Sequence, residues 1–582
     1  MPGGLLNIVA YGASNIILNG NPSKTFFKAA YKKYTNFGLQ RFRLDHKGQR
    51  ILSFDSETLM EFKIPRYADL LWDTYVVVTM PNIWSPLFPR TDISGGYVPY
   101  EFRWTRKLGT TMIREITISS GGSLLARYSG EWMSCVVERD EGPKRRLWNR
   151  MVGNVPEMYD PANANGRGGA YPNAMFFEGG GTTLGSDRVG IEPSIRGRQL
   201  FIPLEAWFSN SSKLALPLVA LQYQEVTIRV RFRPVRDLFT ILDVANVQDV
   251  SYNDCSCNPQ PPQDWNIHKY NLCGQTSGSG QGNTCGFWDR RAPNPADVNH
   301  QLWWFLQPPP AQRLYPSCYL NRRQDWFADI HLLATYVFLG QDERRVFAAR
   351  DHKYLVKTQY HYDFLNATGS KRVRMTSRDM VDSYMFRFRR SDAFMRNEWN
   401  NYTNWPYKGI PPNELVIPTG LQGTTGLSSD SYFRVSPPMD ATNVKEILVD
   451  LGILLGSEYR ENILPVGVYN LVEKWIRTTG EAEDGLYIYN FCINSNRRQY
   501  QPSGAQNMNK WEYVWFEYNT LEPPLDPSNN DVQILCDASG AVIGVRKDLW
   551  RLNKYNYDLR VFESRYNVVV ITSGCIGLAD AR

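Results

Sequence analysis

The stretch QEVTIRVRFRP, residues 224–234, decides the fold class. Its apolar side chains share one parity: Val226, Ile228, Val230 and Phe232. Its polar side chains share the other parity: Thr227, Arg229, Arg231 and Arg233. A period of two is typical of a β-strand with one buried face, and a slip of one residue would bury the arginines. We therefore expect these arginines and the nearby Arg236 to face solvent or a neighbouring subunit.

The same weighing applies to RFRR at residues 387–390, for which we also expect a solvated or inter-subunit face. A nucleic-acid surface is the less favoured interpretation of both stretches. The strand at 224–234 lacks the aromatic platform on which proteins that bind single strands stack bases.

Similar alternating segments, rich in Val, Ile, Tyr, Phe and Trp, recur between turn signals along the whole chain. The first series comprises residues 37–44, 58–65, 73–81, 111–119, 199–204, 216–232 and 329–339. It supplies about eight strands, the number that closes a jelly roll. The second series comprises residues 353–364, 382–390, 444–455, 485–491, 511–519 and 557–574. The chain is thus predicted to be all-β, with two tandem eight-stranded antiparallel jelly rolls, long loops and a few short helices.

A chain of 582 residues exceeds the size at which a single hydrophobic core keeps growing. We predict an N-terminal arm over residues 1–25, a first jelly roll over 26–350 and a second over 351–582. Helical periodicity is convincing only at residues 342–349 and 468–476. Both helices are expected to be short accessories.

Two long segments rich in Gly, Pro and Asn interrupt the first series of strands, at about residues 149–198 and 240–325. Such composition is typical of surface loops, which a sandwich tolerates because loop-closure entropy grows only slowly with length. We expect both loops at one end of the first sandwich, where they would form a tower.

The composition is that of a folded globular chain, with 42% hydrophobic and 21% charged residues. The formal net charge of +7 is small for this length and is not concentrated in one block, whereas dedicated nucleic-acid binders are usually more basic. We expect no sequence-specific nucleic-acid binding. The apolar stretches are too short for a membrane span, and the first residues lack the features of a secretory signal.

The residues that usually mark catalysis or cofactor binding do not occur in recognisable spacings. No Ser lies between glycines at i−2 and i+2, and neither a phosphate-binding G-x-x-x-x-G-K-[ST] loop nor H-E-x-x-H occurs. The six histidines are dispersed. We therefore expect no enzymatic activity, no catalytic residues and no cofactor.

One group of cysteines is a weak candidate for a metal site: Cys255, Cys257, Cys273 and Cys285. A C-x-C opening is unusual for zinc, so disulfides and free thiols remain alternatives to metal binding. The other cysteines are expected to be reduced, buried small hydrophobes: Cys135, Cys318, Cys492, Cys536 and Cys575. The glycosylation acceptor patterns at Asn210, Asn366 and Asn401 are expected to be incidental.

Six stretches in order along the chain resemble the double jelly-roll major capsid proteins of nucleocytoplasmic large DNA viruses. They are IVAYGASNIILNGNPSKTFFKAAYKKYTNF (8–37), ARYSGEWM (126–133), PLEAWFSNSSKLALPLVALQYQEV (203–226), YVFLGQDERRVFAARDHKYLV (336–356), YIYNFCINSNRRQYQPSGAQNMNK (487–510) and RVFESRYNVVVITSGCIGLA (560–579). The first resembles the family's amino-terminal arm, which could pack on its own subunit or lock neighbouring subunits together.

This resemblance implies a major capsid protein that forms homotrimeric, pseudo-hexagonal capsomers tiling an icosahedral shell. It implies neighbouring capsomers, minor capsid proteins and penton proteins as partners. It also implies a location in the virion capsid, with assembly in the host cell cytoplasm.

Two rival functions make different predictions. A carbohydrate-binding or carbohydrate-active β-sandwich protein could use the 17 Trp and 33 Tyr residues at sugar sites, and the active form requires a cleft with two facing carboxylates. A nucleic-acid-coating protein requires affinity that falls steeply as salt is raised.

Overall fold

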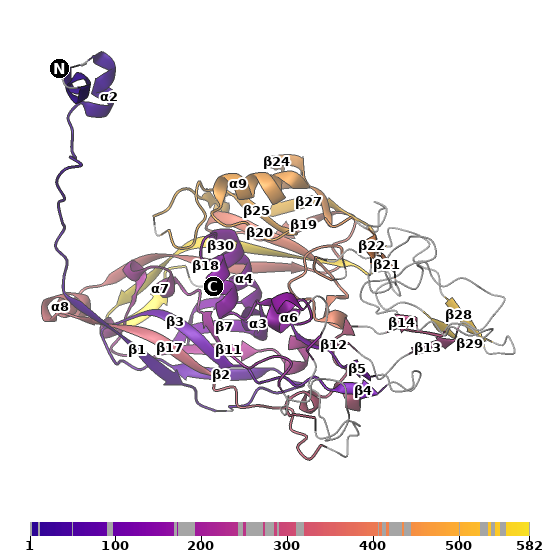
Figure 1. The fold of residues 1–582 in the computed structure, drawn as a ribbon. Coiled ribbons are helices and arrows are strands. Elements are labelled where there is room, and N and C mark those ends of the chain that lie inside the picture. Colours follow the sequence, from indigo (N-terminus) through magenta and orange to yellow (C-terminus); the bar gives the residue numbers. More distant parts are fainter. Residues whose placement is uncertain are drawn as a thin grey trace.

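The fold is described in a computed structural model, shown in Figure 1. It describes residues 3–9, 12–48, 50–89, 97–167, 171–172, 192–242, 248–251, 272–273, 284–287, 290–309, 319–405, 407–409, 415–417, 433–435, 444–499, 501–523, 533–536, 542–546 and 555–580.

The first sandwich consists of two antiparallel sheets. One has the order β1 (Phe37–Asp45), β17 (His331–Leu339), β3 (Leu70–Thr79) and β10 (Leu216–Pro217), with β9 (Gln199–Pro203) also paired to β3. The other has the order β2 (Thr58–Lys63), β11 (Val226–Phe232), β7 (Ile113–Ser120) and β8 (Ser123–Tyr128). Because β1, β2 and β3 alternate between the two sheets, the chain crosses the sandwich in jelly-roll fashion.

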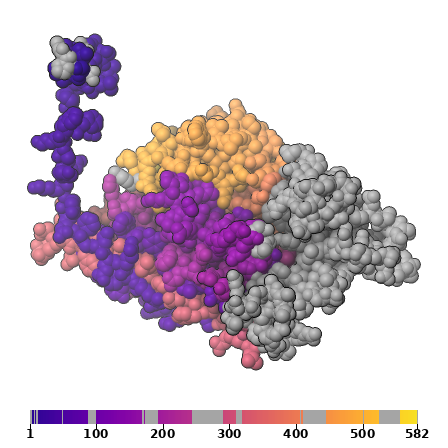
Figure 2. All heavy atoms as spheres, in the orientation of Figure 1, coloured from indigo at the N-terminus to yellow at the C-terminus, as the bar shows by residue number. Residues whose placement is uncertain are grey.

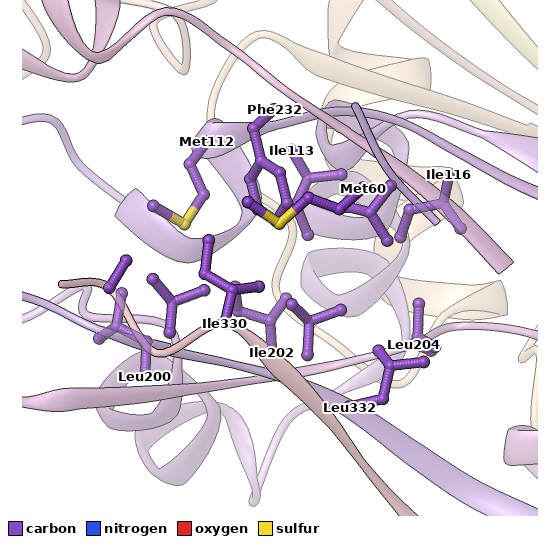
Figure 3. Packing of buried hydrophobic residues seen from close by; sticks show 14 of the residues in the cluster. Met60, Met112, Ile113, Ile116, Leu200, Ile202, Leu204, Phe232, Ile330 and Leu332 are labelled. Carbon is purple, nitrogen blue, oxygen red and sulfur yellow. The ribbon is translucent and has the colours of Figure 1, made fainter. Parts of the chain in front are cut away.

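The core of this sandwich lies between the two sheets. The apolar side chains of β11 point into it, as their alternation predicts. Ile228 pairs with Phe62 on one side and Ile118 on the other, and all three side chains are fully buried. Figure 3 shows Met60 and Phe232 of one sheet facing Ile202 and Leu332 of the other. Burying the four apolar side chains of β11 contributes roughly 6 to 12 kcal/mol before entropy is counted.

The second sandwich repeats the same strand order. Its first sheet runs β18 (His352–Phe364), β30 (Tyr557–Thr572), β20 (Met380–Arg390) and β25 (Leu486–Asn490), with β26 (Gln506–Asn507) on β20 and β31 (Cys575–Leu578) on β30. Its second sheet runs β19 (Ser370–Met375), β27 (Val514–Thr520), β23 (Leu448–Leu455) and β24 (Glu458–Pro465). The predicted fold class, an all-β double jelly roll, is confirmed.

The remaining strands are short and form small sheets of their own. They are β4 (Leu87–Pro89), β5 (Tyr97–Pro99), β6 (Phe102–Trp104), β12 (Phe239–Leu242), β13 (Gln248–Ser251), β14 (Leu272–Cys273), β15 (Thr284–Phe287), β16 (Arg290–Arg291), β21 (Leu415–Ile417), β22 (Phe433–Val435), β28 (Gln533–Cys536) and β29 (Val542–Arg546). In Figure 1 the pairs β21/β22 and β28/β29 lie at the end of the molecule opposite α8 (Gln341–Ala349), as do β13 and β14.

The two predicted helices are present. Helix α8 connects β17 to β18, and a π-helical turn, η13 (Val468–Val472), continues into α9 (Glu473–Arg477). The other helices were not predicted: α1 (Leu6–Val9), α2 (Ile16–Asn19), α3 (Leu108–Met112), α4 (Gly130–Asp140), α5 (Arg145–Met151), α6 (Pro156–Tyr159) and α7 (Trp207–Asn210).

Helix α4 is the most informative of the unpredicted helices, because it lies between the two sandwiches (Figure 1). It begins at a side-chain cap, in which the Ser129 hydroxyl accepts a hydrogen bond from the Trp132 backbone N–H. All of its residues except Trp132 are buried. A helix that is covered on every side has no polar stripe, so the period of 3.6 residues cannot reveal it.

Parts of the two segments predicted to be surface loops, residues 149–198 and 240–325, are packed inside the protein, whereas others, such as residues 320–323, are exposed as predicted. In the first segment Val152 and Met158 are buried, and in the second Leu302 and Phe305 are fully buried. Met158, Leu302 and Phe305 enlarge the core of the first sandwich, and Val152 packs with Val137 and Trp148 in a small separate cluster. Apolar packing therefore holds these parts of the two segments in place. The rest of the two segments lies outside the described residues.

The described part of the N-terminal segment, which ends where β1 begins, extends away from the body of the molecule (Figure 2). Phe26 is 85% exposed and Phe27 is 99% exposed, so neither packs on its own subunit. The division of the chain at residues 25 and 350 stays a prediction. No described helix has the length and apolar character needed to cross a membrane.

Candidate functional site

The outer face of β11 carries arginines that are neutralised by carboxylates on adjacent strands and turns. Arg229 Nε lies 2.8 Å from Glu61 of β2, and Arg231 lies 3.8 Å from Glu115 of β7. Both arginine side chains are about half exposed. The prediction that these arginine side chains point away from the core is confirmed for Arg229 and Arg231. Because each arginine has a carboxylate partner within the same sheet, the face offers little unpaired positive charge to a polyanion.

Arg236 and Arg233, at the end of the same stretch, have different surroundings. Arg236 is partly exposed and lies 3.4 Å from Asp55. The guanidinium of Arg233 lies over the Trp399 ring, 4.6 Å from its centroid, and burial lowers the pKa of Arg233. Arg233 is half-buried, so it meets the expectation of an outward-facing side chain only in part, since Trp399 of the same chain covers its guanidinium.

The stretch RFRR contradicts the expectation of a solvated or inter-subunit face. Arg387 is 1% exposed and Arg390 is 4% exposed. Arg387 Nε donates to Glu131 Oε1 at 2.6 Å, and Arg390 donates to both carboxylate oxygens of Asp392 at 2.9 and 2.8 Å. Arg387 lies on the outward parity of β20 and is buried because α4 of the first sandwich packs on this face of the sheet. Arg390 lies on the apolar parity, after Phe386 and Phe388, at the end of the strand. A charge buried there requires a partner, and each arginine has one.

Glu131 is the centre of a cluster of cations at this seam between the sandwiches. Besides Arg387, it lies 2.6 Å from Arg560 and 3.6 Å from Arg389. Burial acts to raise the pKa of Glu131, but the charges of these three arginines outweigh it and hold the pKa well below its ordinary value of 4.5. Glu131 is therefore ionised and joins α4 to strands β20 and β30.

A second cluster lies at the C-terminal half of α4. Lys107 and Glu138 are both 2% exposed and form an ion pair, and Lys107 Nζ lies 2.9 Å from Glu483 of the second sandwich. Lys408 also pairs with Glu483. Burial acts to raise the pKa of Glu483, but Lys107 and Lys408 hold it low.

A third cluster is formed by Arg139, Asp140, Glu205 and Arg497. Arg497 bridges the two sandwiches, because its Nε donates to Glu205 at 2.5 Å while its backbone N–H donates to Asp140 at 3.0 Å. Arg139 donates to the same Asp140 carboxylate at 2.7 Å. Every charge in this cluster is therefore paired within the seam.

Backbone hydrogen bonds and apolar packing complete the seam. Gly480 N–H donates to the Arg139 carbonyl at 2.8 Å, and Ala482 N–H donates to the Glu138 carbonyl at 3.0 Å. The apolar contacts join α4 to the outer face of the second sandwich: Cys135, Val136, Met385, Tyr402, Ala482, Leu486, Ile488 and Phe562. The seam combines the burial of a domain core with paired charges, so the two sandwiches form one packed unit.

The sequence signal for this seam was present but was missed. The helix reads GEWMSCVVERD, with charged residues at both ends of an apolar run and the N-cap Ser129 before it. Charged residues next to a buried run predict ion pairs only if their partners are known, and those partners lie more than two hundred residues away in β20 and β30.

One aromatic-lined pocket tests the carbohydrate interpretation. It has a volume of about 230 Å³, and Trp84, Trp303 and Trp326 contribute to its wall. Asp325 is the sole carboxylate among the described residues that line it. The pocket therefore lacks the pair of facing carboxylates that glycoside hydrolysis uses.

The cysteine candidates are only partly described. The backbone register of β14 and β15 places Cys273 directly opposite Cys285, whereas Cys255 and Cys257 lie outside the described residues. Within the described ranges, no group of three or more His, Cys, Asp and Glu is placed to hold a metal ion. Whether these four cysteines bind metal, form disulfides or stay free remains a prediction.

Of the five single cysteines, Cys135 and Cys492 are free and buried as predicted, and burial raises the pKa of Cys135 to about 12. Cys575 is exposed, which contradicts the prediction that it is buried, because it begins the short edge strand β31. The side chains of Cys318 and Cys536 lie outside the described residues.

The acceptor patterns for glycosylation differ in access. Asn401 is buried, donates to the Trp405 carbonyl at 2.7 Å and accepts from the Thr403 hydroxyl at 2.7 Å. Asn401 Nδ2, the atom to which a glycan would be attached, is therefore buried and already hydrogen-bonded. Asn210 is half-buried, and Asn366 is exposed.

The repeated sheet order defines the class of the molecule as a double jelly-roll protein. Solved structures share this fold: PBCV-1 VP54 superimposes with a TM-score of 0.55 at 18% identity, covering 96% of this chain and 100% of that chain. The Faustovirus major capsid protein superimposes with a TM-score of 0.57 at 11% identity, covering 98% of this chain and 96% of that chain.

Sequence comparisons point to the particular family. Residues 25–261 match the family described as "Major capsid protein N-terminus". The major capsid protein of Chrysochromulina ericina virus is 30% identical over 271 residues, which cover 43% of this chain and 44% of that protein. The chain thus matches less than half the length of this relative. The major capsid protein of Paramecium bursaria Chlorella virus 1 is 21% identical over 589 residues and covers 100% of both chains. The resemblance to the major capsid proteins of nucleocytoplasmic large DNA viruses is confirmed.

Proposed function

We propose that the chain is the major capsid protein of a large DNA virus and has a structural function, with no enzymatic activity. Three copies would form a homotrimer in which six similar sandwiches make a pseudo-hexagonal capsomer. Capsomers of this kind would tile an icosahedral shell, with minor capsid and penton proteins as further partners. The shell would be assembled in the host cell cytoplasm.

The observation that carries this proposal is that two sandwiches of the same strand order are locked together by a buried, charge-paired seam. Two like modules held at a fixed angle let an object with three-fold symmetry imitate six-fold packing. A hinge between the sandwiches would remove this property, since the six modules could not keep one spacing. The full-length match to a viral major capsid protein supports the same function.

The N-terminal arm supports contacts between copies. Large apolar side chains are exposed in the arm and in the residues that join it to β1: Leu5, Leu6, Ile8, Val9, Ile16, Ile17, Leu18, Phe26, Phe27, Tyr31 and Tyr34. Isolated exposed apolar residues are normal, but a continuous segment of them indicates a surface that a partner covers. We propose that the arm locks neighbouring subunits together.

A second exposed apolar surface lies on the second sandwich. Trp475 is 88% exposed, and Leu471 and Ile476 are each 66% exposed on η13 and α9. Large aromatic side chains are enriched in the buried centres of protein interfaces. We propose this helix as a contact with a neighbouring copy.

The mass in solution tests the oligomer. Light scattering at micromolar protein is expected to give three times the 67.0 kDa of the chain. Obligate contacts between subunits should bury more than about 2,000 Å² in total, which makes dissociation at this concentration unfavourable. A stable monomer would contradict the proposal.

Deletion of residues 1–25 tests the arm. We expect the shortened protein to form trimers but to assemble shells poorly, because the described large apolar side chains of this segment are exposed in the single chain. A matched variant, with Ile16, Ile17 and Leu18 changed to Ser, keeps the length of the arm and should reproduce the defect. Normal particles from both proteins would refute the role of the arm.

A further inference from the structure

The aromatic-lined pocket of the first sandwich is a feature that the proposed capsid function does not use. Three segments build its wall: the residues that follow β3, the turn η8 (Leu302–Trp304) with the residues after it, and the residues that precede β17. Its volume of about 230 Å³ admits a small molecule or the last unit of a polymer, but not a folded partner.

Hydrogen bonds between these segments hold the pocket in shape before any ligand binds. The Trp84 backbone N–H donates to the Phe305 carbonyl at 2.8 Å, and the Trp326 indole N–H donates to the Thr79 carbonyl at 2.8 Å. Trp303 is 5% exposed, so it is fixed by the packing around it. A wall that is already ordered loses little entropy when a ligand binds.

Trp84 offers the pocket an aromatic ring and a hydrogen-bond donor. Its side chain is half-buried, and no other aromatic ring in the described part of the chain stacks on it. Its indole N–H stays accessible and has no hydrogen-bond partner among the described residues. The face of an indole carries partial negative charge, which attracts the polarised C–H groups on the face of a sugar ring.

Polar groups with unused hydrogen-bonding capacity line the same pocket. The Asp325 carboxylate is half-buried, yet nothing in the described chain pairs with it or donates to it. Gln307 Nε2 donates to two backbone carbonyls at 3.2 and 2.5 Å, which leaves its Oε1 to accept. Asn82 Oδ1 accepts from a backbone N–H at 2.7 Å, which leaves its Nδ2 to donate. The pocket therefore offers acceptors and donors together.

This mixture of groups selects the class of ligand. A hydroxyl group both donates and accepts, so a molecule with several hydroxyls can satisfy Asp325 and the Trp84 indole N–H at once. An apolar ligand would leave the carboxylate without a partner in a drier site, and an anion would be repelled by it. Arg323 also lines the pocket, but it is exposed, so solvent screens its charge.

We propose that this pocket binds a neutral hexose at the end of a glycan. Trp84 stacks on one face of the sugar ring, and Asp325 accepts hydrogen bonds from its hydroxyl groups. Binding requires no hydrolysis, in agreement with the single carboxylate in the described lining. The proposal goes beyond the capsid function, because it adds a recognition site to a structural protein.

The pocket and the N-terminal arm lie at opposite ends of the first sandwich (Figure 1). Strand β17 starts at His331, close to Val77 near the end of β3, and it ends at Leu339, which pairs with Phe37 of β1. The pocket is built at the start of β17, whereas the arm joins the sandwich at the other end. Contacts made by the arm therefore leave the pocket open.

The proposed trimer would carry three such pockets. Several sites that engage one branched glycan bind it more tightly than one site does, because the second contact forms at a high effective concentration. This gain in avidity rests on the proposed function, but binding of a single sugar at one pocket does not.

Saturation-transfer NMR on the full-length protein tests the proposal. The probes are the methyl glycosides of glucose, galactose and mannose, with N-acetylneuraminic acid as the acidic counterpart. At least one neutral glycoside should receive saturation at its ring protons, and the acidic sugar should receive none. The proposal is overturned if none of the three neutral glycosides binds, or if the acidic sugar binds as well as they do.

Two variants place the sugar in the pocket. Asp325→Asn and Trp84→Ala should each weaken the affinity by about tenfold or more, because they remove a hydrogen bond to a charged group and the stacking surface, respectively. Asp351→Asn, at an exposed carboxylate, and Trp515→Ala, at a half-buried indole, are the matched controls outside the pocket and should keep the affinity of the wild type.

Unchanged affinity in Asp325→Asn would place the sugar elsewhere and overturn the proposal. This variant should keep the urea midpoint of the wild type, since no described residue depends on the Asp325 carboxylate, so its result does not reflect a failure to fold. A monomer that binds the sugar would refute the trimer and support the pocket, so the two proposals fail separately.

Discussion

Strands β11 and β20 carry nearly the same sequence pattern but lie in opposite surroundings. The first reads VTIRVRF and the second ends in MFRFRR, and in both strands apolar side chains alternate with arginines. Arg229 and Arg231 of β11 are about half exposed, whereas Arg387 and Arg390 of β20 are buried. The apolar parity of each strand faces the core of its own sandwich.

The difference teaches what alternation does and does not determine. A period of two specifies which side chains share a face and which face is apolar, but not what covers the other face. Solvent covers the arginines of β11, whereas α4 covers Arg387 of β20. Arg390 lies on the other face of β20, under the Tyr555 ring. The first set can do without close partners, whereas the second set requires Glu131 and Asp392.

The largest effect should come from breaking the buried pair. Arg387→Ala is expected to lower the free energy of unfolding by about 3 to 5 kcal/mol, because it leaves the Glu131 carboxylate short of a partner inside the seam. The shift of the urea midpoint at neutral pH measures this. A loss of stability as small as that expected for an exposed arginine such as Arg229 would show that water reaches Glu131 in the seam.

A pH titration should give the next largest effect. The folded pKa of Glu131 lies well below its ordinary value of 4.5, so the unfolded chain binds more protons in the acid range. This contribution to stability is fully present above 4.5 and is lost as the pH falls toward the folded pKa. Urea midpoints measured from neutral pH into the acid range should therefore fall.

Glu131→Gln isolates the group responsible, because it removes the titrating carboxylate. We expect the variant to be less stable at neutral pH and to show a flatter dependence on pH below 4.5. An unchanged acid slope would assign the pH dependence to other carboxylates of the seam.

The smallest effect should come from the matched change on the exposed strand. Arg229→Ala is expected to cost between roughly 0 and 1 kcal/mol, because its ion pair with Glu61 is exposed and screened by salt. The same urea experiment measures it, and high salt should reduce the cost further. A cost equal to that of Arg387→Ala would mean that a partner of β11 had been overlooked.

Much of the fold could be predicted from local pattern. The strands at 37–45, 58–63, 199–203 and 331–339 match their predicted segments closely, because each has one face in a core and alternates accordingly. Helix α8 was found because it is amphipathic and has an exposed face. The segments missed, α4 and the packed parts of the two long loops, are covered on several sides or lack periodicity.

Less of the candidate site could be predicted. The pairing of Arg229 and Arg231 within their sheet agrees with the expectation of a polar outer face. The burial of RFRR does not, and neither does the exposure of Cys575. The exposure of each of these residues depends on which distant segment packs against it. Local composition does not specify that segment.

The sequence by itself determined the number of sandwiches, the parity of their strands and the resemblance to viral capsid proteins. Hydrophobic alternation is a local property, because each strand with one buried face must place its apolar side chains on that face, away from water. Only the tertiary structure decided that α4 fills the space between the sandwiches and that Glu131 meets Arg387 there. A long-range contact requires two segments to fit together in shape and charge, and neither segment specifies its partner alone.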